Sequence, residues 1–400
     1  MRSRLRFQVL AFTATRTVLN TLHRMVYPFL PVIGRGLGVD FATLSLALTL
    51  RSLAGVAGPF LASIADSRGR KTGMLFGLLV FTIGVGTVVV WPSYPAFLIA
   101  LIMGMVGKYV FDPSMQAYLG DRVSYARRGR VIAVTELGWS LSFILGVPLM
   151  GFLIARRGWA APFPFFFVAG LLAIGLMAWM LPRDMPRAAN RPGFRQNLTR
   201  VLSYTPALYG LGMGLAISAA NEVVNLVFGV WMEGAFGLKI AALSAASVVI
   251  GFAELGGESF SATLTDRLGK PRSIGLGLIL NSLAALALPF FGGSPIWAAV
   301  GLFLFYITFE FALVSSIPLM TEVLPPARAT LMASNVASHS LGRALGALIA
   351  APLFTLAKAS PHIPDILLCG VAAILFNLLG LFFLGLLDKG LATKQAIENA

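Results

Sequence analysis

The sequence predicts an all-α integral membrane protein made of two similar halves, each with six transmembrane helices. Three observations lead to this prediction. Only 12% of the 400 residues are charged and 57% are hydrophobic, whereas a soluble domain has about twice that charged share. Long apolar segments recur along the whole chain. The second half of the chain repeats features of the first at a nearly constant distance in the sequence.

Twelve segments are long and apolar enough to cross a bilayer, which requires about 20 mostly apolar residues. They are residues 8–33, 42–65, 73–91, 95–118, 131–155, 160–181, 203–231, 241–264, 273–291, 296–318, 330–356 and 364–387. The first segment follows Arg2, Arg4 and Arg6, but it is too long for a signal peptide and lacks a small-residue cleavage site. We therefore expect it to remain in the mature protein as a helix.

The basic residues predict the orientation of these helices. Of 31 Lys and Arg, five lie inside the predicted spans, five lie in loops on one side of the membrane, and 21 lie on the other side. Basic residues accumulate on the cytoplasmic side. We therefore expect both termini in the cytoplasm of a prokaryote and the helices in its cytoplasmic (inner) membrane. The net charge of +15 is then a topology signal, and nucleic acid is excluded as a partner.

The two halves match at a shift of 200 residues. The matching positions include Asp66 and Asp266, Gly69 and Gly269, Gly77 and Gly277, Arg128 and Arg328, and Ser140 and Ser340. A constant register of this kind predicts two bundles of the same topology. The polar, basic and proline-containing segment 182–200 separates them. We therefore expect one bundle in residues 1–181, a cytoplasmic linker in 182–200 and a second bundle in 201–400.

The loop between the second and third predicted helices carries a recognisable motif. Residues 62–71 read Ala-Ser-Ile-Ala-Asp-Ser-Arg-Gly-Arg-Lys, which resembles the signature G-x-x-x-D-R-x-G-R-R/K of the major facilitator superfamily. Ala62 and Ser67 differ from the signature. The equivalent loop of the second half, residues 262–272, keeps the corresponding Asp, Gly and Lys. The resemblance covers essentially the whole chain and implies the major facilitator fold. We call these two segments the first and second gate loops.

The resemblance also implies a role for the gate loops, since such contacts hold the outward-open state in this family. A carboxylate beside several cations can lock two helix ends together, and glycine permits a sharp turn with positive φ. The gate candidates are Asp66, Gly69, Arg70, Lys71, Asp266, Arg267 and Gly269.

Further motifs are similar to those of twelve-helix drug:proton antiporters. The first helix contains Tyr-Pro-Phe-Leu-Pro at residues 27–31, and the fifth carries Gly138, Gly146, Pro148 and Gly151, with Val147 interrupting the usual Gly-Pro pair. Lys108 stands where that group often has a membrane-buried arginine.

Eleven ionisable residues other than His fall inside the predicted spans. Each would cost about 2.5–3.5 kcal/mol if it faced lipid at mid-depth, so we expect them to pair or to line a cavity. The candidates for a substrate and proton pathway are Arg24, Arg51, Lys108, Asp112, Glu136, Glu222, Glu254, Glu258, Tyr306, Glu310 and Arg343. Lys108 and Asp112, and likewise Glu254 and Glu258, share a helix face because they are four residues apart. Arg16, nearer the cytoplasmic end, can instead reach the interface.

No residues with metal-ligand spacing, catalytic triad pattern or GxxxxGK[ST] loop are present. We therefore expect no metal, no cofactor and no enzymatic activity. The expected function is secondary active transport of a small amphipathic solute by alternating access, as proton-coupled efflux. Its partners are then the solute, protons and the lipid bilayer, and the chain acts as a monomer. Two alternatives remain: a transporter or flippase for a lipid or an anionic metabolite, and a non-transporting membrane receptor.

Overall fold

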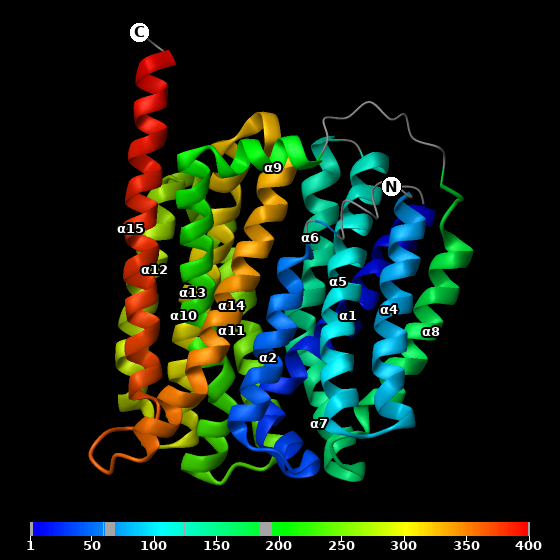
Figure 1. Ribbon diagram of the computed structural model, residues 1–400, viewed down its shortest axis with the longest axis vertical. Helices are drawn as coiled ribbons and strands as arrows, with labels where there is room; N and C mark the ends of the chain where they lie inside the picture. Colours follow the sequence, from blue (N-terminus) through cyan, green and yellow to red (C-terminus); the bar gives the residue numbers. More distant parts are fainter. Residues whose placement is uncertain (1–2, 59, 61–68, 124, 185–193, 399–400) are drawn as a thin grey trace. The chain divides into compact units, whose positions relative to one another are not determined.

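The computed structural model describes residues 3–58, 60, 69–123, 125–184 and 194–398, and the regular structure within these ranges is helical (Figure 1). The chain forms two compact units. Unit 1 comprises Met1–Ala189 with Leu238–Gly251, and unit 2 comprises Asn190–Gly237 with Phe252–Ala400. The predicted all-α class is confirmed. The linker at 182–200 stays a prediction, since residues 185–193 lie outside the described residues.

The helices follow one another with short connections. Unit 1 contains α1 (Ser3–Leu37), α2 (Phe41–Val56), α4 (Arg70–Val90), α5 (Tyr94–Arg122), α6 (Tyr125–Leu141), the π-helical turn η1 (Ser142–Gly146), α7 (Val147–Arg157) and α8 (Pro162–Met180). Unit 2 contains α9 (Phe194–Leu202), α10 (Thr205–Phe236), α12 (Lys270–Ala287), η2 (Leu288–Phe291), α13 (Pro295–Val323), η3 (Pro325–Ala327), α14 (Arg328–Lys358) and α15 (Leu367–Glu398). Helix α11 (Ile240–Leu268) begins in unit 1 and ends in unit 2.

Ten helical segments in the described part of the chain are long and apolar enough to cross a membrane. They correspond to the last ten predicted spans. The first predicted span, 8–33, lies within the 35-residue α1. The second, 42–65, begins in the 16-residue α2 and ends among residues that the structure does not describe. The number of twelve spans therefore stays a prediction.

Each unit contains one long helix that is deeply buried. In unit 1 this is α1, and in unit 2 it is α10, which contacts α13, α14 and α15. Glycines let the helices approach closely. A Cβ atom on Gly77 of α4 would lie 2.6 Å from the Gly107 carbonyl oxygen of α5, and one on Gly277 of α12 would lie 2.8 Å from Cβ of Ala312 in α13. The repeated glycine thus has the same packing role in both units.

Helix starts also repeat between the units. Ser93 caps α5 and Ser294 caps α13, each by accepting a hydrogen bond from the backbone N–H three residues later, at 3.4 and 3.3 Å respectively. A proline follows near each cap, where the helix needs no N–H donor. Such caps satisfy N–H groups that have no partner within their own helix.

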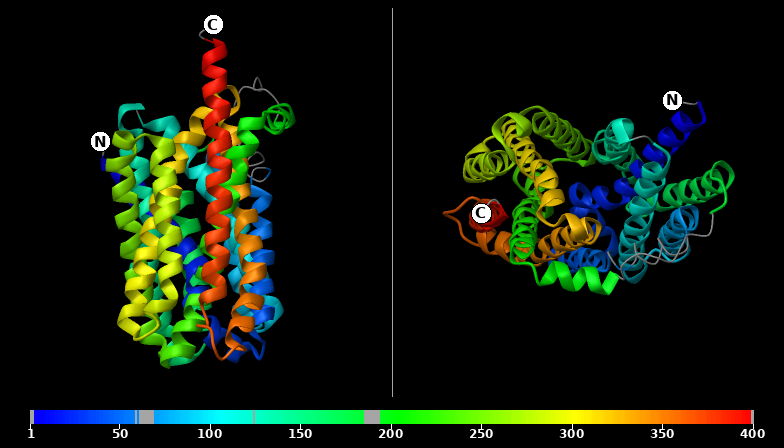
Figure 2. Two further views of the ribbon diagram at one scale, coloured as in Figure 1. Left: turned by 90° about the vertical axis from the view of Figure 1, so that its left-hand side faces the viewer. Right: turned by 90° about the horizontal axis from the view of Figure 1, so that it is seen from above.

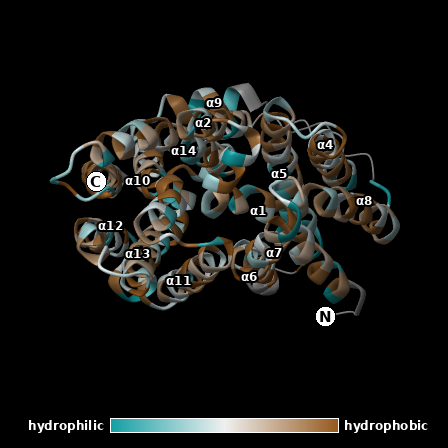
Figure 3. Ribbon diagram, turned by 90° about the horizontal axis from the view of Figure 1, so that it is seen from below, coloured by the Kyte–Doolittle hydropathy of each residue, from teal (hydrophilic) through white to brown (hydrophobic). Residues whose placement is uncertain are grey.

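Most of the ribbon of α8 has the colour of hydrophobic residues (Figure 3). Leu172 and Trp179 on α8 are 69% and 77% exposed. Exposed apolar surface of this extent is typical of lipid contact. At its C-terminal end, α15 extends beyond the neighbouring helices of unit 2 (Figure 2).

Candidate functional site

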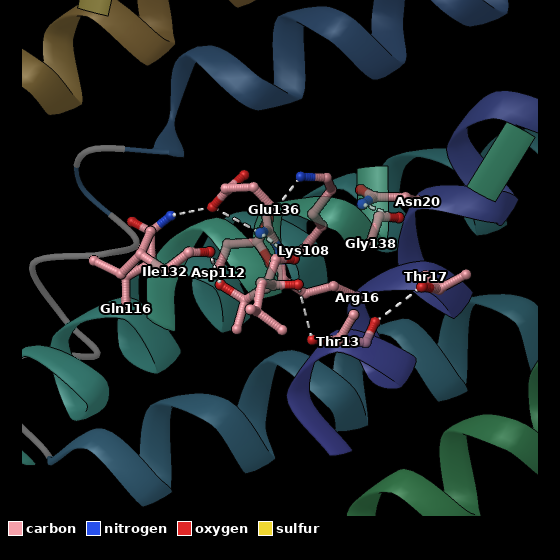
Figure 4. Close-up of polar contacts among 12 residues, drawn as sticks. Thr13, Arg16, Thr17, Asn20, Lys108, Asp112, Gln116, Ile132, Glu136 and Gly138 are labelled. Carbon is pink, nitrogen blue, oxygen red and sulfur yellow. Dashed lines mark hydrogen bonds and ion pairs between the residues drawn. The ribbon is translucent and has the colours of Figure 1, made fainter. Parts of the chain in front are cut away.

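A cluster of four charged side chains lies inside unit 1, contributed by three helices (Figure 4). Arg16 comes from α1, Lys108 and Asp112 from α5, and Glu136 from α6. Arg16 occupies the centre, and its side chain is only 5% exposed. The cluster contains two cations and two carboxylates, so its formal charges balance.

The distances define a continuous chain of ion pairs. Nε of Arg16 lies 3.1 Å from Oδ1 of Asp112, and Nη1 of Arg16 lies 2.7 Å from Oε1 of Glu136. Nζ of Lys108 lies 2.6 Å from Oδ2 of Asp112. Gln116 adds a hydrogen bond of 3.1 Å from Nε2 to Glu136. Lys108 and Asp112, which share a face of α5, thus form an ion pair, and Asp112 is shared between two cations.

Glycines of the antiporter-like pattern bring α1 against α6. A Cβ atom on Gly138 would lie 3.0 Å from Cβ of Arg16, and one on Gly146 would lie 2.0 Å from Oγ1 of Thr21. This close approach lets Arg16 donate a hydrogen bond to the Thr135 carbonyl oxygen at 2.8 Å. The π-helical turn η1 ends two residues before Pro148, whose missing N–H interrupts the α-helical hydrogen bonds.

Two further cations of unit 1 bind aromatic and backbone groups. The guanidinium of Arg24 lies 3.4 Å from the ring centroid of Phe143 and 4.2 Å from that of Trp139. Arg51 of α2 is 1% exposed. It donates hydrogen bonds to the His23 carbonyl oxygen at 3.0 Å and to the Tyr27 hydroxyl at 2.6 Å. Cation–π contact and backbone acceptors stabilise both buried guanidinium groups.

A small cavity opens among α1, α2 and α5 of unit 1. Arg51, Lys108 and His23 contribute the polar part of its wall, and leucine and methionine side chains form the rest. Its volume is about 10 Å³, which is room for about one water molecule.

In unit 2 a fully buried carboxylate begins a hydrogen-bonded chain. Glu222 of α10 has no exposed surface. Asn225, one turn later, donates from Nδ2 to Oε2 of Glu222 at 3.4 Å, and the hydroxyl of Tyr306 in α13 donates to Oδ1 of Asn225 at 2.6 Å. Tyr306 was predicted as a substrate contact, but here it is 1% exposed and links α13 to the Glu222 side chain.

Three other glutamates lie where α11 and α13 meet. Glu254 and Glu310 are buried, and Glu258 is half-buried. A Cβ atom on Gly257 would lie 2.7 Å from Cβ of Glu310. The missing side chain at this glycine therefore brings Glu310 next to the stretch of α11 that carries the other two glutamates. Arg343 of α14 is half-buried and lies one turn before Gly346, which packs against Glu222.

The first gate loop ends in an interaction that the sequence did not indicate. Gly69 has φ of 105° and caps the N-terminus of α4. The backbone N–H groups of Lys71 and Thr72 donate to the carboxylate of Asp184, which follows α8, at 3.0 and 2.9 Å. A Cβ atom on Gly69 would lie 2.2 Å from Cγ of Asp184. Glycine is therefore required both by the backbone angle and by the carboxylate that occupies this space.

Lys71 links α4 to α8 in the opposite direction, from a side chain of α4 to the end of α8. Its Nζ donates to the carbonyl oxygens of Ala178 and Leu181 at the end of α8, at 2.7 and 2.8 Å. Partial burial raises the pKa of Asp184, but the hydrogen bonds from Thr72 and Lys71 lower it by more, so this pKa lies below its ordinary value. The ionised carboxylate thus caps one helix start while the ammonium caps the other helix end.

The remaining gate candidates differ between the units. In unit 1, Arg70 lies 3.5 Å from Asp121 at the end of α5. In unit 2, Lys270 forms the corresponding ion pair with Glu322 at the end of α13. Asp266 and Arg267 are exposed, while Gly269 starts α12 with φ of 87°. Asp66 lies outside the described residues.

Comparison with known proteins identifies the family. The family model of the Major Facilitator Superfamily matches residues 17–347. The chain belongs to this superfamily. It is 24% identical over 373 residues to the "Uncharacterized MFS-type transporter YceJ" of Bacillus subtilis (strain 168), covering 92% of this chain and 93% of that one. It is 25% identical over 210 residues to the "Quinolone resistance protein NorA" of Staphylococcus aureus (strain MSSA476), covering 50% and 53%.

A solved structure shows the same fold. The crystal structure of a D-xylose-proton symporter superposes with a TM-score of 0.77 at 16% identity, covering 94% of this chain and 97% of that one. The predicted resemblance to the superfamily is confirmed. The chain is therefore a multi-pass membrane transporter and not an enzyme.

Two central residues of this Major Facilitator Superfamily chain were missed from the sequence. Arg16 lay in a predicted span, but we expected its side chain to reach the membrane–water interface. The position of a residue along a helix does not reveal which residues of other helices lie beside it. Asp184 lay at the edge of the predicted linker, 113 residues from Lys71. Its signal was weak: a single acidic residue among arginines, directly after a span.

We predict that Arg16→Gln destabilises the protein by about 3 kcal/mol, since the buried Asp112 carboxylate loses one of its two cations. The loss is at the lower end of the expected range because Lys108 still pairs with Asp112. Adding Asp112→Asn should restore part of the stability, as residues in one network are not additive. Differential scanning fluorimetry in detergent measures the Tm of both single variants and the double variant. Strictly additive shifts in Tm would contradict the network.

We predict that Gly69→Ala lowers the Tm more than Gly269→Ala. Both positions have positive φ with extended ψ, so both variants lose about 1–3 kcal/mol from backbone strain. Only at Gly69 would the new Cβ atom also displace Asp184; around Gly269 no atom lies within 4 Å of it. In an Asp184→Ala background the two substitutions should become equally costly. Equal Tm losses in the wild-type background would show that Asp184 does not occupy this space.

We predict that Asp184 makes stability depend on pH below about pH 4. Because its folded pKa is depressed, its contribution is fully present above the ordinary value of about 3.9 and is lost as the pH falls through the folded value. The Tm of Asp184→Asn should therefore change less between pH 5 and 3 than that of the wild type. The exposed Asp388 provides the control, and Asp388→Asn should follow the wild-type curve. Parallel curves for wild type and Asp184→Asn would exclude this role.

Proposed function

We propose that this transporter exports a small amphipathic solute from the cell by alternating access, in exchange for protons. The observation that carries this proposal is the fully buried carboxylate of Glu222 in α10. A carboxylate in a membrane span is costly as an anion, so it favours taking up a proton when buried and releasing it when water reaches it. Such a group supports coupling between proton movement and a change of conformation.

The neighbours of Glu222 support its role as the proton carrier. Asn225 and Tyr306 connect it by hydrogen bonds from α10 to α13. Gly346 of α14 also packs directly against Glu222, because a Cβ atom there would lie 2.8 Å from Cβ of Glu222. A change in the protonation of Glu222 therefore acts on the contacts of three helices at once. Glu254, Glu258 and Glu310 are the further candidates in unit 2.

The charges of unit 1 have a different proposed part. Asp112 and Glu136 are held by Arg16 and Lys108, so we assign this cluster to substrate binding and to the stability of the unit. The expected direction is efflux, which is supported by the similarity to a relative named as a quinolone resistance protein. The expected location is the inner membrane of a prokaryote with both termini in the cytoplasm, supported by the bacterial relatives and by the distribution of basic residues.

The alternative of a lipid or an anionic metabolite as cargo is supported by the cations inside the predicted spans of unit 1, among them the buried Arg51. It differs from the main proposal in the cargo and not in the mechanism. A non-transporting receptor has no supporting observation, and the family makes transport the activity to be tested.

We predict that Glu222→Gln abolishes transport driven by a pH gradient while exchange of substrate across the membrane without a gradient continues. Glutamine has the size of a protonated glutamate but cannot release a proton. The measurement is the accumulation of a fluorescent quinolone in proteoliposomes, with and without a pH gradient. The protein is reconstituted with its cytoplasmic side facing outward, so that export fills the vesicles.

The exposed Asp388 again provides a matched control, since Asp388→Asn removes a carboxylate outside the pathway. If Glu222→Gln accumulates the quinolone as well as the wild type does, the proton is carried elsewhere, and Glu254→Gln and Glu258→Gln become the next variants. Quinolone accumulation by the wild type that is equal with and without a pH gradient would refute proton coupling.

A further inference from the structure

A buried polar cluster lies where α10 packs against α14 in unit 2. Its centre is the imidazole of His339 in α14, and the two side chains that contact the ring are buried as well. Nδ1 of the ring lies 2.7 Å from Oγ of Ser218 in α10. Nε2 lies 3.2 Å from Nδ2 of Asn335, one turn earlier on α14. Both ring nitrogens of this buried imidazole therefore have a polar side chain as partner.

The two partners of the His339 ring can each serve as donor or as acceptor. A serine hydroxyl does so by rotation of its O–H bond, and an asparagine amide does so by exchanging Nδ2 for Oδ1. Oδ1 of Asn335 accepts no hydrogen bond from the described residues in its present orientation. A Cβ atom on Gly214 would lie 2.8 Å from this oxygen, so the glycine leaves room for the amide. The cluster can therefore satisfy the imidazole in either neutral tautomer and as an imidazolium.

The same helix interface leads from His339 to Glu222. Ser218 comes four residues before Glu222 on α10, so both lie on one helix face. That face is turned towards α14, since Ser218 contacts His339 and a Cβ atom on Gly346 would lie 2.8 Å from Cβ of Glu222. The same Cβ atom would lie 2.7 Å from the carbonyl oxygen of Ala219. Contact this close leaves little room for water between the helices, so polar side chains provide the path along this interface.

Arg343 lies between these two groups along α14, one turn after His339 and one turn before Gly346. Burial and a nearby cation both favour the neutral imidazole in this conformation, so His339 holds a proton only briefly. A proton on His339 with Glu222 ionised gives two positive charges and one negative charge. A proton on Glu222 with His339 neutral leaves the single positive charge of Arg343. The net charge is the same in both cases, so transfer between the two groups buries no additional charge.

Other helices that pack against α14 also carry acidic and basic side chains, which are Arg200, Glu233, Glu310, Glu322, Asp388 and Lys389. Four of these six are exposed. Glu310 packs against Gly257 of α11, and Glu233 is half-buried near the end of α10. Arg343 and Glu222 are therefore the charged groups that follow His339 along the interface.

We infer that His339 and Ser218 form a proton relay to Glu222, which makes His339 a second proton-transfer residue of the proposed exporter. The inference rests on the proposed role of Glu222. Water that reaches the ring in another conformation supplies the proton. The imidazolium gives its Nδ1 proton to Oγ of Ser218 while the hydroxyl proton of Ser218 passes to the carboxylate of Glu222. The products are a neutral imidazole protonated on Nε2, an intact hydroxyl and a neutral carboxyl group, and the reverse steps return the proton. Oδ1 of Asn335 accepts the hydrogen bond from Nε2–H while the ring is charged.

Transport by serine and histidine variants tests the relay. Ser218→Ala removes one oxygen atom and keeps the packing of the interface. We expect Ser218→Ala and His339→Gln each to slow gradient-driven quinolone accumulation about tenfold or more, with little change in the KM for the quinolone. Ser218→Thr keeps a hydroxyl and should slow it less.

Two matched controls remove the same chemical groups elsewhere. Ser316→Ala removes a buried hydroxyl of α13 that donates to the Leu313 carbonyl oxygen, and His362→Gln removes an exposed imidazole. Both should transport as the wild type does. Rates within about twofold of the wild type in both Ser218→Ala and His339→Gln would overturn the relay, because a proton-transfer group contributes far more than that.

Nitrogen-15 NMR of histidine-labelled protein in nanodiscs tests the relay without transport. The chain has three histidines, so the His339→Gln spectrum assigns the signals of this ring. We expect ring shifts between those of the two neutral tautomers, because a relay populates both, and we expect the shifts to move towards one tautomer in Ser218→Ala. A single fixed tautomer in the wild type at every pH at which it transports would contradict the relay.

The two measurements separate the relay from the proposed function. A fixed tautomer together with quinolone accumulation that follows the pH gradient would leave export standing, since Glu222 then receives its proton by another route. Two tautomers that depend on Ser218, together with accumulation that is equal with and without the gradient, would retain the relay and refute the proposed coupling.

Discussion

The burial of charge inside an apolar membrane span is the constraint on which this structure depends most. An ion that faces lipid at mid-depth costs a few kcal/mol, and a buried ion without a partner costs more than a paired one gains. In unit 1 the buried charge of Arg16 is compensated, because its guanidinium contacts two carboxylates from two other helices. The ion pairs therefore act as connections between α1, α5 and α6, and their geometry requires those helices to be close together.

Glycine makes that approach possible. Gly138 and Gly146 leave the space into which α1 fits. Because α1 packs there, the Arg16 side chain lies within ion-pair distance of Glu136. Gly257 has the corresponding effect in unit 2, where it lets Glu310 of α13 approach α11. Interfaces of small residues are the usual means by which helices pack in a membrane, where lipid removes the hydrophobic driving force between them. Polar pairing and close packing are thus two parts of one arrangement.

The same need for partners operates at the helix ends. The first N–H groups and the last carbonyl groups of a helix have no partner within it. Asp184 and Lys71 satisfy those groups on α4 and α8 and so connect the two helices outside the apolar region. This connection adds to the ion pair between Arg70 and Asp121. Residues 70 and 71 at the start of α4 are thereby held to α5 and α8, and a conformational change that moves this helix end has to break charge-assisted hydrogen bonds.

The sequence by itself determined the helical class, ten of the helices and the family, because these follow from composition, hydropathy and motif, which are local properties. It also placed Lys108 and Asp112 on one helix face, since they are four residues apart. Only the tertiary structure decided that Arg16 is the centre of the cluster, that Asp184 occupies the space beside Gly69, and that Arg51 lies in the wall of a cavity with neutral partners. These relations join residues from different helices. The rotation and depth of one helix against another depend on the packing of all their side chains, and no periodicity along the chain encodes them.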